Sequence, residues 1–276
     1  MKMKCIISLV CCFVFVLSSS AQKIVESYIP QKDSVRIGAG KKDYLPFSAK
    51  GFTLILPADT VIKGTIISLE GDAFNIKEMP DDQLIHKQAN AKGFAVLYVC
   101  TGNPVEFYFS DKTISMMDIM INIAMQQYHL PNKNIFLLGV GLGGNRALRY
   151  VEYCKKGKSV FNPAIKGVAL FDSPLDMARM WYEGMKGIKD NAAESAVIEG
   201  KMVTYMLKDN FGGTPKHFVN DYNEYSPYSH YDETNRHIPF FKNIAVRAYT
   251  DNDVAWWLQN KKKTYFEMNA PDMAGL

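Results

Sequence analysis

Four glycines in six positions form the part of this chain whose spacing points most directly to chemistry. The segment Asn134–Asn145 reads NIFLLGVGLGGN, so an apolar strand pattern at Ile135–Leu138 meets a glycine-rich turn, and a helix follows from about Leu142. A G-x-S-x-G turn of this kind holds a serine nucleophile at its tip in strained backbone geometry. Here the tip residue is Gly141, which has no side chain able to attack a carbonyl. The turn therefore indicates a strand–turn–helix fold at this point, but its tip residue has no nucleophilic side chain.

The same glycines also fit the G-x-G-x-x-G fingerprint of a dinucleotide-binding turn, from Gly139 to Gly144. In that turn the glycines let a pyrophosphate approach the start of a helix. Three features count against it. The turn follows about the fourth predicted strand, the next strand-end acid (Asp172) lies 28 residues after Gly144 rather than about 20, and Leu148 stands where close packing favours a small residue. A dinucleotide-binding protein is therefore kept only as a remote alternative.

With Gly141 in the serine position, Gly139 and Gly143 are the small flanking residues that a sharp strand–helix corner requires. On these residues the chain resembles the α/β-hydrolase superfamily over most of its length, about residues 52–257. The resemblance implies an α/β fold with a three-layer, mostly parallel sheet, and relatives that cleave esters or peptides. A narrower similarity to exported bacterial hydrolase-like proteins involves Leu142–Tyr150, Asp172–Asp176, Ser226–Ser229, Asp253 with Trp256 and Trp257, and Asn269–Asp272.

The resemblance implies a triad in the chain order nucleophile, acid, histidine. Gly141 occupies the nucleophile position, and Asp253 best fills the acid position, ahead of Asp251. An aspartate that merely caps the following helix is the competing interpretation of Asp253. No histidine follows Asp253, because all five lie before it: His86, His129, His217, His230 and His237.

The resemblance also implies an oxyanion hole made of backbone N–H groups. One donor would be Leu142, the residue after the nucleophile position, and the other Gly71, in the loop after the predicted strand Gly64–Leu69. An ordinary strand–helix turn is the alternative. Because an enzyme without its triad retains a rate of only roughly 10³–10⁴ over water, we expect no physiological serine-hydrolase turnover from this chain.

Six apolar runs bounded by turn residues are the strands expected to position these groups. Most do not alternate between apolar and polar residues, as is typical of strands covered on both faces. A helix is predicted at Asp111–Tyr128, with Ser110 as its N-cap and a methionine-rich stripe that we interpret as core packing. The expected strands are Phe52–Leu56, Gly64–Leu69, Phe94–Cys100, Ile135–Leu138, Gly167–Phe171 and Ile244–Tyr249.

The interval Ser173–Asn243 is interpreted as a lid inserted between two strands, with a helix at about Ala192–Leu207. Its three histidines are expected to be surface or packing residues. The chain ends at Leu276, before a final strand and helix of this fold could form. The strand before Asp253 is therefore expected to be an exposed edge.

Residues 1–21 have the pattern of an export signal, with Lys2 and Lys4 before an apolar run and a small-residue cleavage site at Ser18–Ala21. The protein is therefore expected to be periplasmic or secreted, with residues 22–276 forming one α/β-hydrolase-like domain. No later apolar run reaches the ~18 residues of a membrane span. The signal holds two lysines and no acid, so the formal charge of +4 falls to +2 on cleavage, which gives no reason to expect nucleic-acid binding. Lys261–Lys263 is interpreted as a solvated helix face.

Two cysteines, Cys100 and Cys154, remain after the signal. The first ends a predicted strand, and the second lies about 13 residues along the helix that starts at the same sheet edge. That separation is roughly 20 Å, which exceeds the ~7 Å limit for bridged Cα atoms. Two free, buried thiols are expected.

The leading functional hypothesis is an exported, catalytically degenerate member of a serine esterase or peptidase family, with no metal and no cofactor. A second is a non-catalytic protein that uses the cleft and the aromatic residues of the insertion to hold a small-molecule or peptide ligand, a lipid or a glycan. A third is an active serine hydrolase represented here by a Ser-to-Gly, C-terminally shortened chain.

Overall fold

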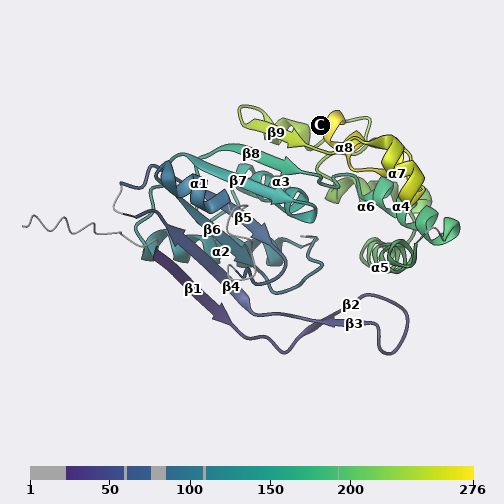
Figure 1. The fold of residues 1–276 in the computed structure, drawn as a ribbon, viewed down its shortest axis with the longest axis horizontal. Coiled ribbons are helices and arrows are strands. Elements are labelled where there is room, and N and C mark those ends of the chain that lie inside the picture. The colour runs from purple at the N-terminus through teal and green to yellow at the C-terminus, as the bar shows by residue number, and fades with distance from the viewer. Residues whose placement is uncertain (1–22, 59–60, 76–84, 108–109, 192) are drawn as a thin grey trace, which may run out of the picture.

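A seven-stranded, mostly parallel sheet forms the centre of the computed structural model (Figure 1). The structure describes residues 23–58, 61–75, 85–107, 110–191 and 193–276. The strand order is β1-β4-β6-β5-β7-β8-β9, antiparallel at β1–β4 and β4–β6 and parallel elsewhere. The strands are β1 (Lys23–Ile29), β4 (Lys50–Leu56), β5 (Gly64–Glu70), β6 (Phe94–Cys100), β7 (Ile135–Val140), β8 (Ile165–Phe171) and β9 (Ala245–Tyr249).

Helices cover both faces of the sheet, which gives three layers. Helices α2 (Asp111–Gln127) and α3 (Leu142–Lys155) share one buried apolar cluster with the sheet. Helix α1 (Ile85–Ala91) packs on the other face, against Ile55, Val96 and Tyr98. The expected α/β class with a mostly parallel sheet is confirmed.

All six expected strands are present, and the predicted helix at Asp111–Tyr128 differs by one residue at its end. Its N-cap is Ser110, and its stripe is core packing: Ile114, Met117, Ile121 and Met125 are buried. The sequence did not predict β1 or the small hairpin of β2 (Ser34–Arg36) and β3 (Tyr44–Pro46). These strands are largely exposed, so they lack the continuous apolar runs by which the others were found.

The interval Ser173–Asn243 is a helical insertion between β8 and β9. Figure 1 shows its helices gathered beyond the carboxyl ends of the parallel strands. Helices α4 and α5 pack closely on each other, and α5 begins two residues later and ends four residues later than the predicted Ala192–Leu207. The role of the insertion as a lid stays a prediction. Its elements are α4 (Met177–Asp190), α5 (Glu194–Phe211), α6 (Pro215–Tyr225) and the 3-10 turn η2 (Ile238–Phe241).

The C-terminal segment returns across the insertion through α7 (Val254–Lys261), η3 (Tyr265–Glu267) and α8 (Ala270–Gly275). Strand β9 is the outermost strand on its side of the sheet and is mostly exposed, as expected of an edge. The lysine run is not a purely solvated face, because Lys263 forms an ion pair with Glu183 and lies 5.8 Å from the centroid of the Trp257 ring.

Cys100 and Cys154 are free and buried, as predicted. Burial raises the pKa of the Cys100 thiol to about 11 and that of Cys154 to about 12. Within the described residues, no helix is both long and apolar enough to cross a bilayer. The predicted export signal at residues 1–21 lies outside the described residues.

Candidate functional site

Gly141 stands at a sharp corner between β7 and α3. Its backbone has φ 53° and ψ −125°, a combination outside the regions that L-residues favour. Its N–H donates a hydrogen bond of 2.9 Å to the carbonyl of Phe171, at the end of the neighbouring strand. A Cβ placed on Gly141 would meet no described atom within 4 Å. The corner thus has the backbone conformation of a nucleophile elbow, which would be strained for a residue with a side chain, and open space where the nucleophile would stand.

Two neighbouring glycines let α3 approach the sheet closely. A Cβ on Gly139 would overlap the backbone of Gly144, and a Cβ on Gly144 would overlap the side chain of Ser173. At Gly143 a Cβ would lie at ordinary contact distance, 3.5 Å from the carbonyl oxygen of Leu69. The glycines that packing requires are therefore Gly139 and Gly144, whereas the predicted flanking role of Gly143 has no steric basis.

The corner lies where the sheet changes its direction of winding. From β5 the chain crosses through α1 to β6 on one side, and from β7 it crosses through α3 to β8 on the other. In open α/β sheets, ligands bind in the crevice at the carboxyl ends of the strands that flank such a point. Gly141 and Gly71 follow those two strands.

Leu142 and Gly71 are the predicted backbone donors. Leu142 is the first residue of α3, so its N–H has no partner within the helix. Gly71 is buried against residues 103–104, where a Cβ would lie 2.7 Å from the carbonyl oxygen of Asn103. Because β5 and β7 are adjacent, both residues lie at the same sheet edge. Their role as an oxyanion hole stays a prediction.

Asp253, the predicted acid, follows β9 two strands away from β7. Val140, Phe171 and Tyr249 are register partners across the three strands, which sets the strand ends roughly 10 Å apart. The carboxylate of Asp253 is exposed and accepts a 2.9 Å hydrogen bond from the backbone N–H of Trp256 at the start of α7. The contacts of this side chain are those of a helix cap, which is the competing interpretation of Asp253. Its exposed neighbour Asp251 accepts from the N–H of Asp253 at 3.2 Å.

His237 is a buried packing residue of the insertion. Its Nδ1 lies 3.0 Å from a carboxylate oxygen of Glu152, and its Nε2 lies 2.9 Å from the carbonyl oxygen of Asn223. Burial alone would raise the pKa of Glu152, but the hydrogen bond with His237 and the charge of Arg149 lower it to about 2. Both ring nitrogens of His237 are thus engaged in structural contacts.

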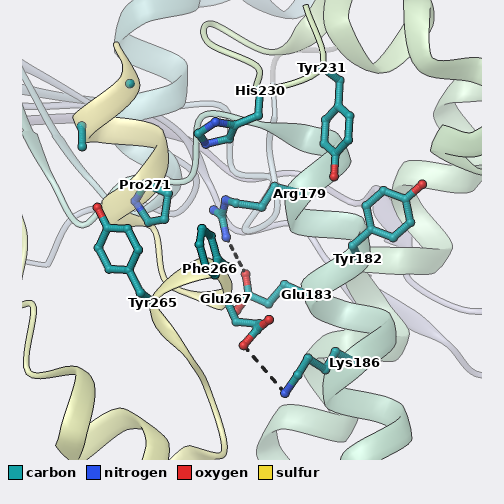
Figure 2. A pocket seen from close by; sticks show the side chains of 12 residues that line it. Arg179, Tyr182, Glu183, Lys186, His230, Tyr231, Tyr265, Phe266, Glu267 and Pro271 are labelled. Carbon is teal, nitrogen blue, oxygen red and sulfur yellow. Dashed lines mark hydrogen bonds and ion pairs between the residues drawn. The ribbon is translucent and has the colours of Figure 1, made fainter.

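A pocket of about 680 Å³ opens between α4, the loop around His230 and the C-terminal segment η3–α8 (Figure 2). Aromatic rings from three parts of the chain line it, and they alternate with charged side chains that pair with one another. Figure 2 shows the contacts of Arg179 with Glu183 and of Lys186 with Glu267. The aromatic lining consists of Tyr182, Tyr231, Tyr265 and Phe266.

Behind this pocket, Arg179 is tied to the fully buried Asp272 of α8. Two nitrogens of its guanidinium donate to the two carboxylate oxygens of Asp272 at 2.5 and 2.8 Å. The backbone N–H groups of Leu175 and Asp176 donate to the same carboxylate at 2.9 and 3.0 Å. Burial alone would raise the pKa of Asp272, but hydrogen bonds from His230 and Arg179 lower it. The network fastens the C-terminal helix to the start of α4.

Asp176, His230 and Asp272 offer possible metal-ligand atoms within 4.8 Å of one another. The oxygens of Asp176, however, already accept from two backbone N–H groups of α4, the N–H of His230 and the hydroxyl of Ser229. Both oxygens of Asp272 already accept from the Arg179 guanidinium, whose positive charge would repel a metal cation. The three residues therefore fit a hydrogen-bonded network and do not fit a metal ion.

The sequence indicated these segments without indicating their contacts. Asp172–Asp176 and Asn269–Asp272 were among the residues that carried the narrower resemblance, yet nothing pointed to a contact between segments some 96 residues apart. Arg179 was not among those residues, and the structure places it three residues after Asp176, whose side chain caps α4.

Comparison with solved structures finds hydrolase folds at low identity. Candida antarctica lipase A is 9% identical over 86% of this chain and 75% of its own, with a TM-score of 0.47. A putative carboxylesterase from Lactobacillus plantarum is 10% identical over 87% and 93%, with a TM-score of 0.41, and a Pyrobaculum calidifontis esterase is 13% identical over 83% and 75%, with a TM-score of 0.47. No protein-family model and no curated protein sequence matches the chain.

At these identities and scores the likenesses say nothing about activity. What the structure itself shows is a mostly parallel sheet with helices on both faces and a sharp strand–helix corner at the sheet's carboxyl edge.

Proposed function

We propose that this protein is an exported α/β-hydrolase-fold protein, related to serine esterases and peptidases, that does not itself hydrolyse substrates through a serine nucleophile. The observation that carries the proposal is the corner at Gly141, where the backbone has the conformation of a nucleophile elbow and the space for the side chain is empty. The signal-like start of the sequence supports export.

The test is hydrolysis of p-nitrophenyl acetate and p-nitrophenyl butyrate, together with labelling by a fluorophosphonate probe. The purified protein is expected to remain unlabelled and to release p-nitrophenol no faster than the same protein after heat denaturation. Labelling of a single serine together with saturable turnover of either ester would overturn the proposal.

A non-catalytic ligand-binding protein is the second candidate, and the aromatic pocket of about 680 Å³ favours it. A molecule that binds only the native state raises its melting temperature. Thermal unfolding with a tripeptide, chitotriose or monolaurin is expected to show such a rise for one of them, without product formation. Tyr182→Ala with Tyr231→Ala should abolish the rise, and Tyr44→Ala, an exposed tyrosine that does not line the pocket, should leave it unchanged.

An active serine hydrolase whose chain is altered at position 141 and shortened is the remaining alternative. Genomic sequence that covers codon 141 and the region after codon 276 separates it from the two proposals above. A serine codon at 141 and a downstream histidine-bearing extension would favour the active enzyme.

A further inference from the structure

An apolar groove of about 410 Å³ runs between α2, β1 and β4. It lies at the β1 edge of the sheet, which three strands separate from β7 and the corner at Gly141. Its floor includes the buried ring of Phe52, and its walls come from one side of α2 and the end of β1. The apolar lining residues are Ile29, Phe52, Met116, Ile119, Met120 and Ile123.

The isoleucine side chains that form the walls of the groove are exposed although they are apolar. Ile29 is 62% exposed, Ile119 46% and Ile123 48%. The last two lie four residues apart on α2, so they stand one above the other on the same side of the helix. Several large aliphatic side chains that share one exposed groove mark a binding site more often than isolated ones do.

The end of the groove at the start of α2 carries Lys112, and Lys50 also lines the groove. Lys50 begins β4 and lies opposite Ile29 in the β1–β4 ladder. Lys112 is in the first turn of α2, where the helix dipole is positive. Both line the groove, and neither is in an ion pair among the residues that the structure describes, whereas the adjacent Asp111 is paired with Lys158 at 2.5 Å.

The other end of the groove is apolar. Ile123 is eleven residues further along α2 than Lys112, or about 16 Å at the rise of an α-helix. The groove therefore presents Lys112 at the end where α2 begins, Lys50 on its β4 side, and isoleucine and methionine side chains toward Ile123. This polarity matches a molecule with an anionic head and a single alkyl chain.

We propose that this groove binds one single-chain carboxylate amphiphile, of the fatty-acid class. The carboxylate lies between the ammonium groups of Lys50 and Lys112. The alkyl chain lies over Phe52 and runs along α2 toward Ile123. An apolar helix or strand of a partner protein would cover the isoleucines but leave two cations unneutralised in the contact, which the carboxylate neutralises.

The test is isothermal titration calorimetry of the full chain with laurate below its micelle concentration. We expect saturation at one laurate per chain. The variant Lys50→Glu with Lys112→Glu should lower the affinity about ten-fold or more. The matched variant Lys189→Glu with Lys216→Glu changes charge equally at exposed positions outside the groove and should bind laurate as the unchanged protein does.

Dodecanol, which has the same chain length without the charge, should bind more weakly than laurate. The variant Lys50→Glu with Lys112→Glu should bind dodecanol as tightly as the unchanged protein does. Four results would overturn the proposal: no laurate binding, many laurates per chain, equal laurate affinity in the two charge-reversed variants, or binding to phosphatidylglycerol vesicles without binding of monomeric laurate. A concentration-dependent dimer that Ile119→Asp abolishes would instead assign the groove to a second copy of the chain.

Discussion

At the scale of single residues, the backbone at Gly141 carries the most information. Several residue types can adopt a φ of 53°. Combined with a ψ near −125°, however, this backbone conformation lies outside the left-handed region that asparagine and aspartate tolerate. Such conformations cost about 1–3 kcal/mol when a side chain is present. Glycine relieves that cost, so the present chain keeps the corner and loses the strain of an occupied elbow.

We therefore predict that Gly141→Ser lowers the free energy of unfolding by about 1–3 kcal/mol, although its side chain meets open space. Gly157→Ser is the matched control, because Gly157 also has a positive φ (71°), also has open space, and lies just after the end of the same helix. It should cost less, since a residue after a helix usually adopts the permitted left-handed conformation. Urea denaturation measures both variants, and an equal or smaller loss at position 141 would contradict the strain.

At the scale of elements, α3 joins the corner to the helical insertion. Two of its polar residues face the insertion: Arg149 donates to the carbonyl of Glu224 at 3.2 Å and lies 5.1 Å from the centroid of the Tyr225 ring, while Glu152 contacts His237. Helix α3, which begins at Leu142 directly after the corner, thus also contacts the insertion.

A pH-dependent loss of stability follows from Glu152, whose pKa in the folded protein is about 2. Because this value is below the unfolded value of about 4.3, the stabilisation is present above about pH 4 and is lost as the pH falls toward 2. Glu152→Gln should therefore destabilise the protein by about 3 kcal/mol at pH 7 and by about half as much at pH 3.

Urea denaturation at the two pH values measures the difference, with the exposed Glu199→Gln as the control that changes neither. A destabilisation by Glu152→Gln that is as large at pH 3 as at pH 7 would show that shape, and not charge, holds α3 to the insertion.

The elements also show how far sequence reasoning reaches. Strands such as Phe94–Cys100 were predicted without error, because central strands covered on both faces are continuous apolar runs. Strand β1 was missed, because an edge strand exposes most of its residues and resembles a loop in composition. Helix α8 could not be predicted, since its six residues are held by the contact of Asp272 with Arg179 and not by local propensity.

At the scale of the whole molecule, three regions are candidates for binding: the corner at Gly141, the aromatic pocket beside Arg179, and the groove along α2. The glycine pattern alone predicted the first, because a strand, a turn and a helix follow one another in sequence. The other two join elements that are distant in the chain, such as α4 with α8, and β1 with α2. Their positions depend on tertiary packing, which single-sequence patterns do not encode.

The central claim is that position 141 is the former place of an attacking group at the start of α3. The most direct test is the rate at which iodoacetamide alkylates Gly141→Cys at pH 7, compared with Gly157→Cys at the other end of the same helix. A helix N-terminus lowers the pKa of a thiol, whereas the C-terminal end does not. The native Cys100 and Cys154 give little background alkylation, because burial raises their pKa to about 11 and about 12. With labelling located by peptide mass spectrometry, the account predicts alkylation at position 141 at least about ten-fold faster than at 157. Equal or slower alkylation at 141 would contradict it.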